Sequence, residues 1–271
     1  MKTIPLFPAL ALSAMLALPS ALHAQQESAD RWLDSCRHGD WGDRGRFCDV
    51  KQFTINSPAR SVRVDAGPNG GVNVHGWDKP TMLVVARIQA NGDDDADAKD
   101  LASRISITAE PSRIGSDGPS DDRHHGWSVS FDVYVPAKTA IDASTRNGGV
   151  SAEKMNGHLE LSTTNGGIHL VDVAGDVHAE TTNGGVSASL TGTTWDGAGL
   201  DLRTTNGGVT LEIPKGYNAR LETGTTNGGF SIDFPITVQG RLGRRIATTL
   251  GKGGPMIRAT TVNGGVRIRE R

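Results

Sequence analysis

Apolar and polar residues alternate along most of the chain after residue 59. A period of two places every second side chain on the same face of a strand, so this alternation predicts short strands with one buried face. The clearest apolar positions are Leu159 and Leu161, Ile168 and Leu170, Val177 and Ala179, Val186 and Ala188, Leu200 and Leu202, and Val209 and Leu211. The pattern therefore predicts an all-β fold.

The alternating segments flank a repeated turn sequence. Asn-Gly-Gly occurs seven times, and after the start at Asn69 the starts from Asn147 onward are 18, 18, 23, 21 and 36 residues apart. We interpret the last gap as two units of 18. Asn and Gly tolerate positive φ at little cost, so we predict that these residues form the structural turns. The predicted turn residues are Asn147, Gly148, Asn165, Gly166, Asn183, Gly184, Asn206, Gly207, Asn227, Gly228, Asn263 and Gly264.

The same residue types recur in phase in every unit, which is typical of stacked repeats. We therefore predict a β-solenoid or β-helix-like stack with about 18 residues per coil. Because Asn-Gly also forms hairpins, an antiparallel β-meander is the second topology. The residue two positions before each Asn shares the inward parity, which predicts a structural column of Thr145, Thr163, Thr181, Thr204, Thr225 and Thr261.

Three segments differ in composition. Residues 1–24 carry Lys2, an apolar run from Leu6 to Leu18 and a small residue at Ala24, which is the pattern of a secretory signal peptide. Residues 25–55 alternate little, and we expect them to form an irregular cap on the first coil. Residues 56–271 form the repeat domain. No second apolar stretch of spanning length follows the signal, so we expect an exported protein without a transmembrane segment, periplasmic, associated with the cell envelope or secreted.

The two cysteines of the chain, Cys36 and Cys48, lie in the predicted cap. Two cysteines in an exported chain predict one disulfide bond. They lack the Cys-x-x-Cys spacing of redox and zinc sites. We expect the disulfide to be structural.

The distribution of charge limits the classes of binding partner that the sequence predicts. The formal net charge is −2, so bulk charge predicts neither a polyanionic nor a polycationic partner. Residues 236–271 are basic but carry no aromatic side chain to stack on bases, so we expect no nucleic-acid binding. We expect the last strand, from Val266, to be an exposed sheet edge that Arg267, Arg269 and Arg271 protect against pairing.

Two polar clusters could suggest a metal. The run Asp93-Asp94-Asp95-x-Asp97 lacks the Gly and the distal Glu of a calcium-binding EF-hand loop. We interpret it as the start of a helix over residues 95–104, with Ala98, Leu101 and Ala102 on one side. The pair His124-His125 ends a Gly-, Ser- and Asp-rich loop. We predict no metal site and no cofactor.

Several motifs together resemble a known family. They are Val-Asp-Ala-x-x-Asn-Gly-Gly-Val at 64–72, His75-Gly76-Trp77-Asp78, the strand end at 133–136, the Thr-x-Asn-Gly-Gly repeats, and the Gly-rich segment 249–254 before Ile257. The chain resembles the bacterial putative-adhesin β-strand-repeat domain over residues 55–271. The resemblance implies a β-solenoid-like fold in exported or envelope proteins, and it implies no catalytic residues.

Stacking in register would gather charged side chains on one outer face. Residues five before each Asn would form one row, and residues three before each Asn the next. The candidates in these rows are Glu160, His178, Glu180, Asp201 and Arg203. Paired carboxylates beside a histidine can serve acid–base chemistry, whereas opposite charges across strands also form an ordinary solvated face.

We therefore expect a non-enzymatic, envelope-associated binding, adhesion or scaffold module whose partner is an envelope polymer or protein. The alternative is a polysaccharide hydrolase or lyase that uses the outer patch.

Overall fold

The computed structural model describes residues 20–38, 44–236 and 244–271, so most of the predicted signal peptide lies outside the described residues. The described chain is almost entirely β, with two ten-stranded sheets and two helices, α1 (Ser20–His38) and α2 (Asp95–Ser103). The prediction of an all-β protein therefore holds. Residues 20–24, the end of the predicted signal, form the first turn of α1.

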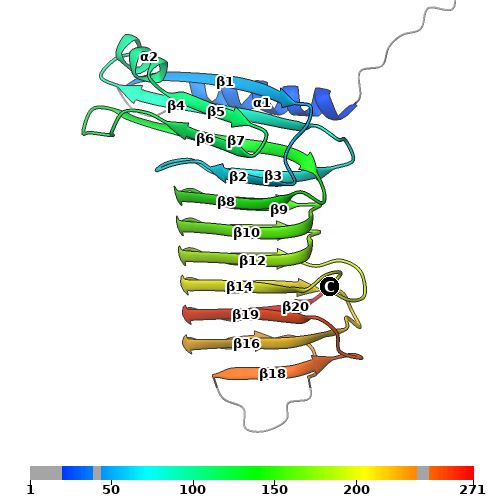
Figure 1. Cartoon of the computed structure of the whole chain (residues 1–271). Coiled ribbons are helices and arrows are strands. Elements are labelled where there is room, and N and C mark those ends of the chain that lie inside the picture. The colour runs from blue at the N-terminus through cyan, green and yellow to red at the C-terminus, as the bar shows by residue number, and fades with distance from the viewer. Residues whose placement is uncertain (1–19, 39–43, 237–243) are drawn as a thin grey trace, which may run out of the picture.

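The strands of each sheet follow one another along a single stack (Figure 1). In spatial order, sheet A contains β1 (Gly45–Ile55), β4 (Met82–Gly92), β7 (Gly126–Pro136), β3 (Val72–Trp77), β9 (Val150–Glu153), β11 (Ile168–Val171), β13 (Val186–Ser189), β15 (Val209–Ile213), β20 (Val266–Glu270) and β17 (Phe230–Ile232). Sheet B contains β18 (Arg245–Leu250), β16 (Ala219–Asn227), β19 (Met256–Asn263), β14 (Gly199–Asn206), β12 (Ala174–Asn183), β10 (Asn156–Asn165), β8 (Ala140–Asn147), β2 (Ser61–Asp65), β6 (Arg113–Asp117) and β5 (Ser106–Glu110).

Each repeat contributes one strand to each sheet, and equivalent residues of neighbouring repeats face one another. Asn165, for example, pairs with Asn147 on one side and with Asn183 on the other, in parallel strands. The antiparallel meander is therefore wrong for the repeats. Antiparallel pairs occur only toward the ends of the described sheets, where β4 joins β1 and β7, β5 joins β6, and β18 joins β16. Both sheets are consequently mixed.

The order of the repeats in space differs from their order in the sequence. The last repeat, β19 and β20, lies between β14/β15 and β16/β17 (Figure 1). The 36-residue gap is thus not two stacked units, because Asn227 and Asn263 are direct neighbours. The gap instead contains β17 and β18, and β18 pairs antiparallel with β16.

The insertion of the last repeat also overturns our expectation of an exposed C-terminal edge. Strand β20, which carries Arg267 and Arg269, has β15 on one side and β17 on the other. The final strand is therefore internal to sheet A. The start of the stack shows the same arrangement, since β2 and β3 lie between β6/β7 and β8/β9.

The Asn-Gly-Gly segments form the corner at which the chain passes from sheet B to sheet A. We predicted glycine at these corners because it tolerates positive φ. Among the first glycines of the Asn-Gly-Gly segments, only Gly70 and Gly264 have positive φ, so this explanation is wrong for the others. A Cβ at Gly166 would instead lie 1.9 Å from the carbonyl oxygen of Gly148 in the neighbouring repeat. Close approach of the stacked backbones, rather than a left-handed conformation, requires glycine here.

Two columns of side chains hold the corners together. Each buried Thr of the predicted inward column donates its hydroxyl to the carbonyl of a corner glycine in the neighbouring repeat, as in Thr163 Oγ1 to Gly148 O at 2.9 Å and Thr181 Oγ1 to Gly166 O at 2.8 Å. The exposed Asn side chains form a second column, in which Asn165 Nδ2 donates to Asn147 Oδ1 at 2.8 Å. The predicted threonine column therefore exists and is structural.

The core lies between the two sheets. It is filled by the inward side chains of both sheets, such as Leu159 and Leu161 from β10 and Ile168 and Leu170 from β11, all essentially inaccessible to solvent. The alternate side chains of the same strands face outward. The outer faces of both sheets are thus available to carry function.

Residues 25–55 are more regular than we expected. They contain most of α1 and the eleven-residue strand β1, which pairs antiparallel with β4 at the end of sheet A. Cys36 and Cys48 form a disulfide bond between α1 and β1, with Cα atoms 6.3 Å apart. The segment covers the N-terminal end of the stack, but as a helix and a sheet strand rather than as an irregular cap.

Candidate functional site

The five charged candidates lie together on the outer face of sheet B. Glu160, His178 and Asp201 form one cross-strand row on β10, β12 and β14. Glu180 and Arg203 form part of the next row, also on β12 and β14. Their strand neighbours on the opposite face are buried, so alternation turns all five side chains outward.

His178 is at the centre of this outer patch. Its Nε2 lies 3.8 Å from Glu160 Oε1 and 3.5 Å from Glu180 Oε2, and its Nδ1 lies 4.0 Å from Asp201 Oδ2. Arg203 donates to both carboxylate oxygens of Asp201, from Nε at 3.0 Å and from Nη2 at 2.6 Å. The patch is a network of polar contacts across three strands.

Arg258 completes the network and was missing from the sequence-based set. Its Nη1 donates to Asp201 Oδ2 at 3.2 Å, and its Nη2 donates to Glu222 Oε2 at 2.9 Å. The hydrogen bond to Glu222, together with the bond to Asp201, raises the pKa of Arg258. The signal was present in the sequence, since Arg258 lies five residues before Asn263. The misread 36-residue gap kept it out of the row.

The pairing limits what the patch can do chemically. Asp201 accepts from two arginines and Glu222 from one, so both carboxylates are engaged in ion pairs. A hollow of about 420 Å³ adjoins the patch, and Arg203, Arg245 and Arg258 are among its lining residues. Neighbouring cations favour recognition of a ligand over proton abstraction by these two carboxylates.

A second feature, which the sequence analysis missed, is a trough on the outer face of sheet A. The second glycine of each Asn-Gly-Gly has no side chain and forms the floor, from Gly71 through Gly149, Gly167 and Gly185 to Gly208. The wall is a row of short polar side chains, namely Asn73, Ser151, His169, Ser187 and Thr210. The trough has a volume of about 710 Å³ and crosses five neighbouring repeats.

The trough is uncharged along most of its length. His169 Nδ1 lies 2.6 Å from Ser187 Oγ, and Ser151 Oγ donates to Asn73 Oδ1 at 2.7 Å. Beyond Thr210 a further hollow of about 430 Å³ continues past Gly265 and Gly229, where Arg267 is the first charge. Because the wall residues repeat with the strand spacing of about 4.8 Å, the trough offers regularly spaced hydrogen-bonding groups.

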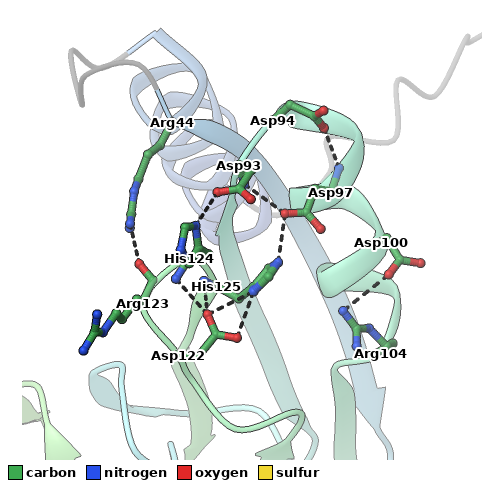
Figure 2. A network of polar contacts seen from close by, with 10 residues as sticks. All are labelled: Arg44, Asp93, Asp94, Asp97, Asp100, Arg104, Asp122, Arg123, His124 and His125. Atoms are coloured by element: carbon green, nitrogen blue, oxygen red, sulfur yellow. Dashed lines mark hydrogen bonds and ion pairs between the residues drawn. The ribbon is translucent and has the colours of Figure 1, made fainter.

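A third polar cluster lies at the N-terminal end of the stack, where the loop between β6 and β7 meets α2 (Figure 2). His125 bridges the two, with Nε2 at 2.9 Å from Asp97 Oδ2 and Nδ1 at 3.0 Å from Asp122 Oδ1. His124 Nδ1 lies 2.8 Å from Asp93 Oδ1. The cluster therefore ties the loop to the start of the helix.

The titration of this cluster follows from its hydrogen bonds. The backbone N–H groups of His124 and His125, with the ring of His125, lower the pKa of Asp122 to about 2. The hydrogen bond that the His125 ring donates to Asp122 raises the pKa of His125, and the charge of Asp97 adds to this. The pair is therefore held as carboxylate and imidazolium at mildly acidic pH.

The acidic run beside this cluster acts as the helix start that we predicted. Asp94 is the N-cap of α2, and its Oδ1 accepts from the backbone N–H of Asp97 at 2.8 Å. Ala98, Leu101 and Ala102 form the buried side of the helix. Within the described residues, no group of three or more His, Cys, Asp or Glu side chains is arranged to hold a metal ion.

The repeat units match a known family. Residues 137–269 match the family model described as Toastrack DUF4097. The match covers just under half of the chain and shows that this part is similar to the Toastrack family. The predicted relationship to a β-repeat family of unknown function is thereby confirmed, and the match begins just before β8 and ends in β20, so the outer patch and most of the trough lie within the Toastrack segment.

Solved structures are similar at low identity. A putative cell adhesion protein from Clostridium sporogenes has 10% identity and a TM-score of 0.41, over 83% of this chain and 100% of that chain. A putative adhesin from Bacteroides fragilis has 8% identity and a TM-score of 0.40, over 83% and 97%. A putative lipid binding protein from Parabacteroides distasonis has 7% identity and a TM-score of 0.25, over 83% and 96%. No curated protein matches the sequence.

Proposed function

We propose that this protein is a non-enzymatic binding module that holds an extended polymer of the cell envelope along the trough of sheet A. The observation that carries the proposal is the trough itself, a continuous groove across five repeats with a glycine floor and a wall of short polar groups. A repeating wall suits a repeating ligand. The neutral wall favours an uncharged polysaccharide over a polyanion.

An exported location belongs to the same proposal. It is supported by the signal-peptide pattern of residues 1–24 and by the disulfide bond between Cys36 and Cys48, since such bonds persist in oxidising compartments. None of the described helices has the length and apolar character to cross a bilayer. From the signal-peptide pattern and the disulfide bond we propose that the protein is periplasmic, associated with the envelope or secreted.

The alternative is hydrolysis or elimination at the outer patch of sheet B. It would require a carboxylate that can gain or lose a proton during the reaction. The two arginines on Asp201 and the single arginine on Glu222 argue against that role for both residues. Incubation with envelope polysaccharide, followed by detection of new reducing ends or unsaturated products, would reveal such an activity.

A matched pair of substitutions tests the binding proposal. Ser187 and Ser189 lie two residues apart on β13 and face the same side, but only Ser187 lines the trough. We expect Ser187→Trp to fill the trough and to abolish co-sedimentation of the protein with purified envelope polysaccharide. Ser189→Trp should bind like the wild type. Equal binding by both variants, or no binding by the wild type, would contradict the proposal.

A further inference from the structure

A separate hollow lies at the corner opposite the Asn-Gly-Gly turns, where the chain returns from sheet A to sheet B. The links at this corner are short between β9 and β10 and between β11 and β12, but β13 and β14 are separated by residues 190–198. This longer link accounts for the 23-residue spacing in the sequence. Insertions in repeat proteins often lie on the binding face.

The inserted link borders a pocket of about 330 Å³. Trp195 from the link packs into the corner, 3% exposed, and its Nε1 donates to Gly175 O at 2.9 Å. The link is joined to the next corner, where Thr194 Oγ1 donates to Asn218 O at 2.9 Å. These contacts fix the pocket as part of the folded stack. We refer to it as the corner pocket.

Tyr217 is a buried polar residue of this pocket whose hydroxyl lacks a protein partner. Its side chain is 3% exposed, and its hydroxyl makes no hydrogen bond to the described residues. In the described chain, Arg87 Nε is the one side-chain nitrogen or oxygen that is fully enclosed and has no hydrogen-bond partner. Because the Tyr217 hydroxyl also has no partner, it is not fully enclosed and retains access to open space. Buried tyrosine hydroxyls ordinarily find a partner, and this one lines the corner pocket instead.

The backbone around the pocket is also unusual. Lys154 and Asp172 have φ of 54° and 52°, and they are the only non-glycine residues with positive φ in the described chain. Both line the corner pocket. Strained residues of this kind cluster at ligand sites, where the strain positions a side chain.

The polar groups of the pocket supply both donors and acceptors. Asp172 Oδ1 accepts from Thr191 Oγ1 at 2.6 Å, and Asp196 Oδ2 accepts from Asn156 Nδ2 at 3.1 Å, so each carboxylate is oriented and keeps further lone pairs. Lys154 supplies an ammonium group. The hydroxyl of Tyr217 can both donate and accept.

We propose that the corner pocket binds a single uncharged sugar residue. Sugar hydroxyls donate and accept at once, which matches two oriented carboxylates, an ammonium and an unpaired phenol around an aromatic and apolar wall. The two aspartates, against the single positive charge of Lys154, disfavour an anionic ligand. A volume of about 330 Å³ suits one ring rather than a polymer. The pocket shares no lining residue with the trough, so the inference goes beyond the proposed function.

The two tyrosines of the chain provide the test. Uncharged monosaccharides (glucose, galactose, mannose and N-acetylglucosamine) are titrated into the labelled protein, and amide chemical shifts are followed by NMR. We expect at least one sugar to perturb Lys154, Asp172 and Thr194. Tyr217→Phe should weaken that binding roughly three- to tenfold while the thermal midpoint stays unchanged, since no protein hydrogen bond is lost. Asp172→Asn should also weaken it.

Tyr134→Phe, on β7 and outside the corner pocket, serves as the matched control and should bind like the wild type. The absence of perturbation by all four sugars would overturn the proposal, as would equal affinity of the wild type and Tyr217→Phe. Ser187→Trp should retain the monosaccharide response whatever it does to polymer capture. Failure of the trough proposal and failure of the corner-pocket proposal are therefore distinguishable.

Discussion

At the scale of single residues, each Asn-Gly-Gly corner depends on a threonine hydroxyl, which donates a hydrogen bond to a glycine carbonyl that no backbone N–H of the described residues reaches. Gly148 and Gly166 lie outside the strands, and no backbone N–H of the described chain donates to their carbonyl oxygens. The buried hydroxyls of Thr163 and Thr181 take that place. A buried carbonyl without a partner is costly, so each threonine matters to stability.

Replacement of these threonines should therefore destabilise the fold. Thr163→Val and Thr181→Val keep the shape of the side chain but leave a carbonyl unsatisfied, and we expect each to cost about 1–3 kcal/mol of unfolding free energy. Urea denaturation measures the loss. The exposed neighbours Thr164→Val and Thr182→Val are the controls and should change little. Unchanged midpoints in both buried variants would refute the role of the hydroxyl.

The two glycines of one corner should respond very differently to alanine. A Cβ at Gly166 would lie 1.9 Å from Gly148 O, whereas a Cβ at Gly167 would lie 3.3 Å from Gly185 O. We expect Gly166→Ala to destabilise by about 3 kcal/mol or more, because rigid backbone would have to move, and Gly167→Ala to cost much less. Thermal and urea unfolding of the two variants compare them directly. Equal losses would show that close stacking does not select the first glycine.

At the scale of elements, the cluster of Figure 2 couples a loop to a helix through titratable groups. Because the folded-state pKa of His125 is raised, its stabilisation is complete below the ordinary value of 6.5 and is lost as pH rises through the folded value. The pKa of Asp122 is lowered to about 2, so its stabilisation is present above the ordinary 3.8 and is lost as pH falls toward 2. The stabilising contributions of His125 and Asp122 are therefore both present between pH 3.8 and pH 6.5.

A pH series should reveal this window. We expect the thermal midpoint of the wild type to exceed that of His125→Gln at a pH of about 5, and the difference to shrink as the pH rises to about 8. The other histidines are present in both proteins, so their pH-dependent contributions cancel in the difference between the two thermal midpoints. A difference that is constant across this range would mean that the charge of His125 does not hold the loop.

The sequence predicted individual elements well and their neighbours less well. Alternation identified the inward leucines of β10 and the inward threonines, because burial on one face imposes a period of two. The common phase of the repeats also brought Glu160, His178 and Asp201 into one row. The regular spacing of the repeats does not show which repeat lies beside which in space. The position of Arg258 between Asp201 and Glu222 could therefore not be predicted. The trough was missed because it is formed by absent side chains, and Tyr217 because its significance lies in a missing partner.

At the scale of the whole molecule, the stack is continuous only when the last repeat is in place. Strand β17 pairs with β20 alone, and β16 reaches β14 only through β19. A chain ending at Pro255 should therefore leave residues 219–232 without these partners. We expect rapid amide exchange in that segment and continued protection of residues 140–189. Full protection of 219–232 in the shortened chain would contradict the dependence.

The position of the last repeat also has a consequence for biosynthesis. Domains that emerge from the ribosome or from a secretion channel can begin to fold from their N-terminal end. In this chain residues 256–270 are made after β16 and β17 but belong inside the stack, so growth by simple addition of each new repeat to the previous one cannot produce the native order. Strand β16 can pair with β18 earlier, but its other side and strand β17 must wait for residues 256–271 before they find their neighbours. Synthesis of residues 256–271 thus becomes a checkpoint for assembly, because a chain that stops before them lacks the strands that join β16 and β17 to β14 and β15.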